Sequence, residues 1–465
     1  MHPRAGGGGR LRLWLVFGAG EALFVGFAVL PDAKTHLAAY LLLFFAGSLL
    51  SLVAARSLSA SSGRVVLLCA AAFRLTLLWR APDLSDDAFR YLWDGRVAAS
   101  GRSPYAFAPA DAYEDPFPDH LRRRLAYPEY RTIYPPVAQA AFRIAASVPA
   151  AGMLAMKALF AAADVAVVAL ILATGGAGAR FGAALYAFHP LPVTETAGQG
   201  HVDALGAALV LASVAFLLRR RPIVSGFAFA ASVLVKYVPI AAALPLVRRG
   251  RLRFAGAALV TAAAVWALAA RGGTSPAVGL GPYATRWEFN SLAYPAVAAA
   301  VESTDLPAKA KAAYIRWKEK REHRPWMQKV FPYFYTAFFA RVLLAITLGA
   351  VLLGIAVAVK DVELAVFASL AALLLGSPTL HPWYLLWVLP FAAKRREPAF
   401  LYLCTAAPLA YGLLHPLAGL TPSAIRFIEY GPFAMLLATS LFKAARRRAD
   451  TPSPRLRGEG WGEGQ

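Results

Sequence analysis

Two adjacent carboxylates open a polar and aromatic block in a chain that is otherwise mostly apolar. The segment from 84 to 105 has the sequence LSDDAFRYLWDGRVAASGRSPY. Ser85 followed by Asp86 and Asp87 predicts a helix start, because a hydroxyl caps the helix and acids favour its positive end. Two interpretations stay open: the acids only cap this helix, or one of them acts as a general base towards a hydroxyl group.

The helix that starts here would carry one polar stripe. Its members follow one another at helical spacing, and they are Asp87, Arg90, Tyr91 and Asp94. Such a helix would lie along the outer membrane surface, where this arrangement is costly unless it has a use. If a lipid phosphate is the leaving group, it needs no partner acid, so one base and a few cationic contacts would suffice.

Three further ionisable residues, Glu195, His201 and Asp203, interrupt hydrophobic sequence on both sides. At membrane depth such groups mark a site or a buried pair, whereas just outside the bilayer they would form an ordinary polar loop. Lys236 stands alone in an apolar stretch. It either extends to the interface or pairs with a lipid phosphate.

Other candidates lie near proline-rich or aromatic segments. Tyr134 precedes two prolines, which suits a helix entry or the mouth of an active site. Candidate ligands for the phosphate end of a lipid-linked substrate, on expected outer loops, are Arg286, Glu288, Asn290, His381 and Tyr384. An aromatic belt at the membrane interface is expected for Trp287, Trp383 and Trp387.

The composition places these residues in a polytopic membrane protein. Hydrophobic residues make up 58% of the 465, charged residues 16%, and the mean hydropathy is +0.52. The apolar runs predict an all-α bundle of roughly 11–13 transmembrane helices. Prolines break the segments between 136 and 253. Half-spans or re-entrant helices are expected there, since lipid tolerates broken helices only under protein cover.

The net charge of +22 is not a sign of nucleic-acid binding, because basic clusters lie at the ends of hydrophobic runs. They are Arg56 and Arg64, Arg219 to Arg221, Arg248 to Arg253, Lys394 to Arg396, and Lys443 to Arg448. The positive-inside rule makes these loops and both termini cytoplasmic, which places the loops 81–135 and 271–335 outside. Short interfacial helices are expected in these loops, and the basic stretch 308–322 predicts a helix on anionic headgroups without catalysis.

Two cysteines, Cys69 and Cys404, lie in different apolar stretches and predict neither a disulfide framework nor a metal pair. No Walker loop, dinucleotide fingerprint or nucleophile elbow is present, which argues against direct nucleotide use and serine-hydrolase chemistry. A single membrane domain over 1–445 and a disordered Gly-rich tail over 446–465 are expected.

Several strings resemble one family in order along the chain, from about residue 10 to 440. They are SDDAFRYLWDGRVAASGRSPY, TIYPPVAQ, FHPLPVTETAGQGHVDAL, LVKYVPIAAALPL, WEFNSLAY and SPTLHPWYLLWVLPF. The chain resembles the bacterial polyprenyl-phosphate-sugar-dependent glycosyltransferases of the GT-C superfamily, in particular the mannosyltransferase-like branch. The resemblance implies that Asp86 or Asp87 is the catalytic base. It also implies that the polar residues at 195–203 shape the donor or acceptor pocket.

The resemblance further implies transfer of a hexose, most simply mannose, from a polyprenyl phosphate donor to a lipid- or glycan-linked hydroxyl, with inversion. The site would face outward from a bacterial cytoplasmic membrane, with membrane lipids around the protein and no nucleic acid. The resemblance implies no particular cofactor, and a divalent cation stays open. The alternative is a lipid-linked glycan flippase or secondary transporter, but these usually show internal repeats, and the block 84–105 has no counterpart elsewhere.

Overall fold

A computed structural model describes residues 7–58, 62–111, 119–148, 151–321 and 324–449. These residues form helices and connecting loops, with no strand among them beyond one isolated bridge between Phe289 and Thr379. The predicted all-α membrane fold is confirmed, since five helical segments are long and apolar enough to cross a bilayer. The expected tail over 446–465 lies mostly outside the described residues.

The N-terminal half of the bundle contains long helices and shorter, broken ones. The long helices are α1 (Gly7–Val29), α2 (Leu37–Leu58) and α7 (Gly152–Thr174). The shorter ones are α3 (Gly63–Leu77), α6 (Pro136–Ala146), α8 (Ala179–Phe188), α9 (Pro190–Pro192), the π-helix η2 (Val193–Gly198), α10 (Asp203–Leu218), α11 (Pro222–Val233) and η3 (Val238–Ala242). Helices broken at prolines are found as expected between 136 and 253, because proline lacks the N–H that continues a helix.

The helix α12 (Ala243–Ala269) is kinked inside the basic cluster. Arg251 has φ 54°, a left-handed conformation that breaks the helix into two segments. Next to this break, the Arg248 guanidinium donates to the Val357 carbonyl at 3.1 Å, at the end of α16 (Thr336–Ala358). Residues 243–269 therefore form two helical segments that meet at Arg251, close to the end of α16.

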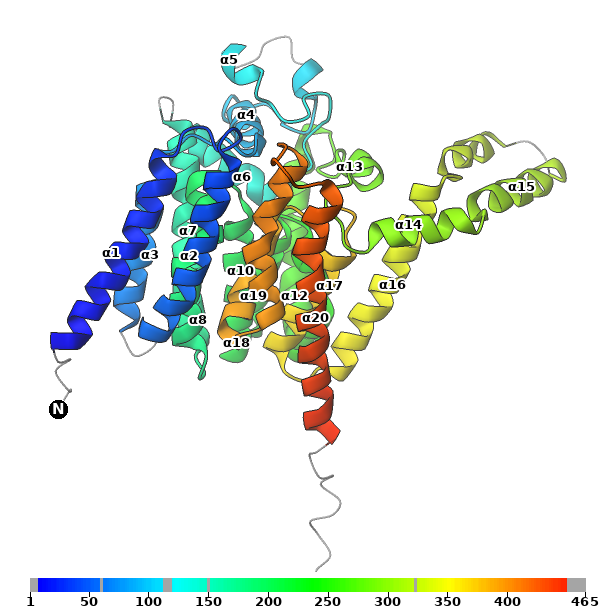
Figure 1. The fold of residues 1–465 in the computed structure, drawn as a ribbon. Coiled ribbons are helices and arrows are strands. Elements are labelled where there is room, and N and C mark those ends of the chain that lie inside the picture. Colours follow the sequence, from blue (N-terminus) through cyan, green and yellow to red (C-terminus); the bar gives the residue numbers. More distant parts are fainter. Residues whose placement is uncertain (1–6, 59–61, 112–118, 149–150, 322–323, 450–465) are drawn as a thin grey trace, which may run out of the picture.

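The C-terminal half completes the bundle. Its elements are α16, α17 (Val362–Gly376), η6 (Pro382–Trp387), α18 (Leu389–Arg395), α19 (Pro398–Ala406), η7 (Ala407–Leu413) and α20 (Pro422–Ala449). Two basic clusters contact the last residues of α7: Arg219 donates to the Ala173 carbonyl at 2.8 Å, and Lys394 donates to Thr174 Oγ1 at 2.9 Å. Helix α1, the first described helix, begins at this same end of the bundle, and helix α20, the last described helix, finishes there (Figure 1).

The opposite end carries short helices that lie across or above the bundle (Figure 1). They are α4 (Asp87–Ala99), η1 (Pro109–Asp111), α5 (Asp119–Arg122), η4 (Ala270–Gly272), α13 (Leu280–Arg286), α14 (Tyr294–Ser303), α15 (Leu306–Glu319) and η5 (Pro325–Tyr333). These elements belong to the two large loops expected at 81–135 and 271–335. The acidic block begins here, with Asp87 as the first residue of α4.

Buried ion pairs fasten the helices beneath this layer. Arg74 of α3 pairs with Asp164 of α7 at 2.8 Å, and both side chains are almost fully buried. The Tyr186 hydroxyl donates to the same carboxylate at 2.5 Å. Because charge at membrane depth is costly unless paired, this cluster holds α3, α7 and α8 in a defined arrangement.

Candidate functional site

A cavity of about 440 Å³ opens among the loops at the end that carries α4. The segments and residues that line it come from distant parts of the chain and include 84–87, 126–127, 130–134, Tyr283, Trp287, His381, Trp383 and Tyr384. Asp86, Asp87, Arg90, Tyr134, His381 and Tyr384 are the predicted site residues among its lining. The cavity therefore brings both carboxylates and the two motifs at 134 and 381–384 together.

Asp87 lines this cavity, and its carboxylate makes few contacts with other side chains. Its Oδ2 lies 3.4 Å from the Tyr91 hydroxyl and 3.5 Å from the Tyr134 hydroxyl, which are long for hydrogen bonds. Burial, and then the Asp87 carboxylate, raises the pKa of Tyr134, so this phenol stays protonated. Asp87 makes no ion pair with any residue that the structure describes. Its carboxylate is available to a ligand.

Asp86 forms an ion pair with Arg124. Its Oδ1 accepts from Arg124 Nη2 at 2.6 Å and from Nε at 3.1 Å. The same Nη2 donates to the Pro82 carbonyl at 3.0 Å, and the guanidinium lies 4.0 Å from the centre of the Phe89 ring. Asp86 therefore fastens the 119–125 region to the start of α4, and the two neighbouring acids differ in what they can do.

Arg90 and Asp94 hold the loop that roofs the cavity. Arg90 Nε donates to Asp94 at 3.0 Å, and its Nη2 donates to the Tyr130 carbonyl at 2.9 Å. Asp94 is fully buried and accepts from Thr132 at 2.5 Å and from Gln139 at 2.9 Å. Tyr91 stacks on Phe142 at 4.6 Å. The polar stripe of α4 thus turns inward, and Asp94 and Tyr91 support the wall instead of lining it.

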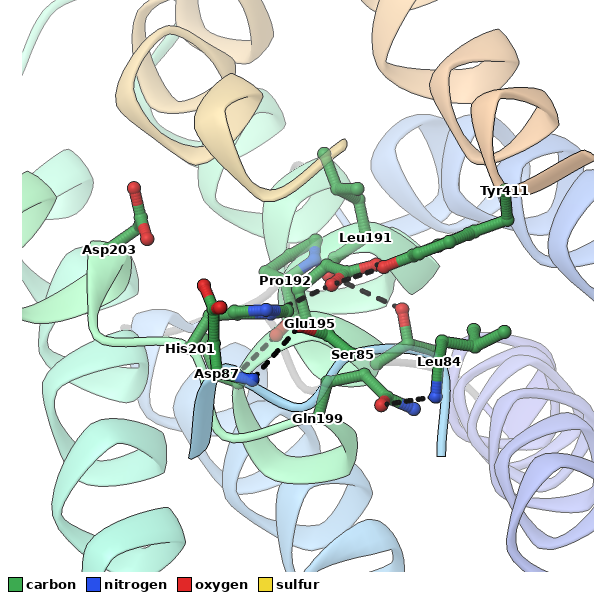
Figure 2. A network of polar contacts seen from close by, with 12 residues as sticks. Leu84, Ser85, Asp87, Leu191, Pro192, Glu195, Gln199, His201, Asp203 and Tyr411 are labelled. Carbon is green, nitrogen blue, oxygen red and sulfur yellow. Dashed lines mark hydrogen bonds and ion pairs between the residues drawn. The ribbon is translucent and has the colours of Figure 1, made fainter. Parts of the chain in front are cut away.

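A buried network lies behind the acidic block (Figure 2). Gln199 Oε1 accepts from the Leu84 amide at 2.9 Å and so fixes the chain just before the two acids. The Tyr411 hydroxyl lies 3.0 Å from both oxygens of Glu195, and His201 Nδ1 lies 3.0 Å from Glu195 Oε2. All three of these side chains are buried, so Glu195 and His201 lie outside the cavity lining.

His201 does not line the cavity, but it belongs to a stack of four rings of which two, Trp383 and His381, do. The centroid of the His201 ring lies 3.9 Å from that of Trp383. The Trp383 centroid lies 4.3 Å from that of His381, and the His381 centroid lies 4.4 Å from that of Phe289. Burial, then Lys236 and His201, holds the pKa of His381 well below its usual range. His381 is therefore a neutral imidazole, not the cation that the sequence alone would allow.

The expectation of an aromatic belt is wrong for two of its three tryptophans. Trp383 and Trp387 are 5% and 0% exposed. The indole N–H of Trp387 donates to Asp203 at 2.7 Å, because a buried donor needs a partner. Only Trp287 keeps some exposure, and it lines the cavity.

Lys236 is paired with a carboxylate. Its Nζ donates to the two oxygens of Asp203 at 2.8 and 3.0 Å, and it lies 4.0 Å from the centre of the Tyr384 ring. Lys236 also lines a second, mainly apolar cavity of about 270 Å³. The two cavities share Ile133, Tyr134, Tyr283 and Tyr384, so they adjoin.

Three other predicted residues lie outside both cavities. Arg286 donates to the Tyr130 hydroxyl at 2.9 Å on the exposed side of the loop. Glu288 pairs with Arg341 at 2.9 Å, and the buried Asn290 donates to Glu429 at 2.8 Å. These contacts connect loops to helices and leave Glu288 and Asn290 structural.

The comparison with known families identifies the group to which this architecture belongs. Residues 19–270, more than half of the chain, match the MptA_B family, described as "Alpha-(1->6)-mannopyranosyltransferase, N-terminal domain". The chain belongs to this family. It is a mannosyltransferase of the membrane, which favours the enzyme over the transporter alternative. No curated protein and no solved structure matches it.

Two cations of the mannosyltransferase cavity were not found by sequence reasoning. Lys34 lies between α1 and α2, and Arg131 precedes α6; both line the larger cavity. Neither makes an ion pair with a described residue. Partial burial, then Lys34, lowers the pKa of His415, which lines the same cavity. Their position in expected outer loops could have indicated a functional role, because the positive-inside rule disfavours basic residues there.

Within the described residues, no group of three or more His, Cys, Asp or Glu could hold a metal ion. Cys69 and Cys404 are free and buried. The lining of the larger cavity supplies carboxylates, phenols and cations.

Proposed function

We propose that this protein transfers mannose from a polyprenyl phosphate carrier to a lipid- or glycan-linked hydroxyl, at the outer face of a bacterial cytoplasmic membrane. The observation that carries this proposal is the position of Asp87 in a cavity lined by several charged and hydroxyl groups, which adjoins a mainly apolar cavity. A lipid-linked sugar has the same division, with a polar head and a hydrocarbon chain. The family description supports mannose and an α-(1→6) linkage.

Asp87 is the proposed general base. It would take the proton of the acceptor hydroxyl while that oxygen bonds to the anomeric carbon. The bond between that carbon and the phosphate oxygen breaks, and the lipid phosphate leaves with the electron pair. This single displacement inverts the anomeric carbon, so an α-linked product requires a β-linked donor. No partner acid is needed for such a leaving group.

Lys34 and Arg131 are the proposed phosphate ligands. They line the cavity without an ion pair to any described residue, whereas Lys236 is neutralised by Asp203. Charge-assisted contacts to phosphate are stronger than neutral ones, and they gain value as charge develops on the leaving group. The carrier's hydrocarbon would occupy the second cavity, whose apolar lining includes Val238, Ile240, Leu373 and Leu374.

An assay with purified protein tests this proposal. Radiolabelled mannose on polyprenyl phosphate is offered with a soluble α-mannoside acceptor, and the matched donor is a nucleotide-activated mannose. Transfer is expected from the lipid donor alone, with an α-(1→6) linkage in the product. Use of the nucleotide donor in the absence of polyprenyl phosphate mannose would overturn the proposed donor.

A further inference from the structure

Residues 294–321 and 324–333 form an arm that projects sideways from the bundle beside the upper part of α16 (Figure 1). Its first helix, α14, packs on α16 through a small apolar cluster of Tyr294, Val301 and Ala340. The second helix, α15, runs across the direction of the bundle helices, towards the end that carries the cavity (Figure 1). This arm is outside both cavities and has no part in the proposed transfer.

The arm is strongly basic. Residues 306–329 contain eight Lys or Arg and two Glu. Lys309, Arg316 and Lys320 are seven and four residues apart, so they lie on one face of the helical segment that begins at Leu306. All three are exposed and form no ion pair with a described residue, although Lys309 donates to the Thr304 carbonyl at 2.8 Å.

Exposed aromatic rings accompany these cations. Trp317 is 37% exposed and Trp326 is 48% exposed, and their rings lie 6.1 Å apart. Tyr314 stacks on Trp317 at 5.6 Å and donates to the Met327 carbonyl at 2.8 Å, which connects α15 to η5. Tryptophan and tyrosine favour the boundary between lipid and water. The combination of basic and aromatic residues is typical of a helix that lies on a membrane surface.

We propose that the arm binds anionic phospholipid headgroups of the leaflet at the cavity end. Its excess of positive charge is complementary to such a surface, and juxtamembrane cations of this kind each strengthen the binding about fivefold. The assignment to the outer leaflet rests on the orientation proposed above, whereas headgroup binding itself does not. An anionic acceptor glycan is the competing occupant, and the test distinguishes it.

The test uses the full chain, with Cys69 and Cys404 replaced and an environment-sensitive fluorophore attached through Ala313→Cys. Ala313 is exposed and lies one turn from Lys309 and from Arg316. The protein is placed in nanodiscs of neutral phosphatidylcholine or of phosphatidylcholine with about 30% phosphatidylglycerol. Quenching by a lipid that carries a nitroxide in its headgroup region reports contact with the surface.

Stronger quenching is expected in the anionic discs, and about 0.5 M salt should reduce it by screening. The triple variant Lys309→Gln, Arg316→Gln and Lys320→Gln should lose most of the difference between discs. A matched control, Arg253→Gln, Lys443→Gln and Arg446→Gln, removes three exposed cations from the opposite end and should keep it. Both variants are first shown to melt at the wild-type temperature.

Equal quenching in both discs, unaffected by the triple variant, would overturn the proposal. So would a fluorophore that stays in water in every lipid and responds only when an anionic acceptor glycan is added. The measurement requires no turnover, so its failure is separate from failure of the proposed transferase reaction. Labelling from each side of sealed vesicles would decide the leaflet independently.

Discussion

The polar groups inside the bundle and those that line the cavity differ in their hydrogen-bond and ion-pair partners. Inside, Asp203 accepts from both Lys236 and Trp387, and Glu195 is in contact with Tyr411 and His201. At the cavity, the Asp87 carboxylate has only two contacts with described residues, both long ones to phenols. Lys34 and Arg131 line the same space without an ion pair to any described residue.

This difference separates structural charge from charge available for binding. Removing an ion from water costs several kcal/mol, so buried charges are retained where partners compensate them. Such groups fix helix positions but have little left for a substrate. At a cavity open to water, an unpaired charge has a lower free-energy cost, because water solvates it until a ligand takes the place of that water. The residues around Asp87 are therefore the ones for which we expect effects on chemistry rather than on folding.

The largest expected effect is that of Asp87→Asn, which removes the proposed base but keeps the side-chain shape. Transfer should slow by about 10²–10⁴-fold. Asp86→Asn is the matched variant and should slow transfer much less, because a partly exposed pair such as Asp86–Arg124 contributes about 0–1 kcal/mol. Initial rates with equal melting temperatures give the answer. A collapse in Asp86→Asn with near-normal Asp87→Asn would reverse the roles of the two acids.

A change in the bundle should act on folding. Asp203→Leu leaves Lys236 without its carboxylate, and breaking a buried pair costs about 3–5 kcal/mol of unfolding free energy. Thermal unfolding in detergent measures this loss. The double variant with Lys236→Met should recover much of it, because no unpaired charge remains. If the single variant melted like the wild type, the pair would not be structural, and the contrast with the cavity would fail.

Smaller effects are expected for the proposed phosphate ligands. Lys34→Gln and Arg131→Gln should each slow transfer by about tenfold to a hundredfold, the usual worth of a contact to a charged group. Inhibition by free polyprenyl phosphate should weaken in parallel, since product and transition state share the phosphate charge. Arg286→Gln, outside both cavities, serves as the control. Slower transfer with unchanged inhibition would assign Lys34 or Arg131 to the acceptor instead.

The smallest effect concerns pH. The pKa of His381 is depressed by burial, so below about 6.5 the unfolded chain binds a proton that the folded chain does not. Stability is therefore lost as pH falls below about 6.5, by up to about 1.4 kcal/mol per pH unit. Melting temperatures at a series of pH values should show this loss in the wild type and a weaker one in His381→Gln. An identical pH dependence in both proteins would remove His381 as its source.

Much of the architecture could be predicted from hydropathy and local composition. The all-α membrane fold, the broken helices between 136 and 253, and the helix starting at the acidic block are properties of nearby residues in the chain. Span length depends on consecutive apolar residues, and proline breaks a helix wherever it stands. The order of the motifs along the chain likewise indicated a mannosyltransferase, which the family match confirms.

Tertiary structure alone decided which charges are free. Asp86 and Asp87 are indistinguishable in sequence, and only Arg124, 38 residues away, occupies one of them. Lys236 looked like a lone cation because its partner Asp203 lies 33 residues earlier. Hydropathy describes how far a side chain prefers lipid or water, but pairing depends on which distant helices meet. For that reason the sequence determined where the candidate site lies along the chain, and the packing of the helices determined which residues face the cavity.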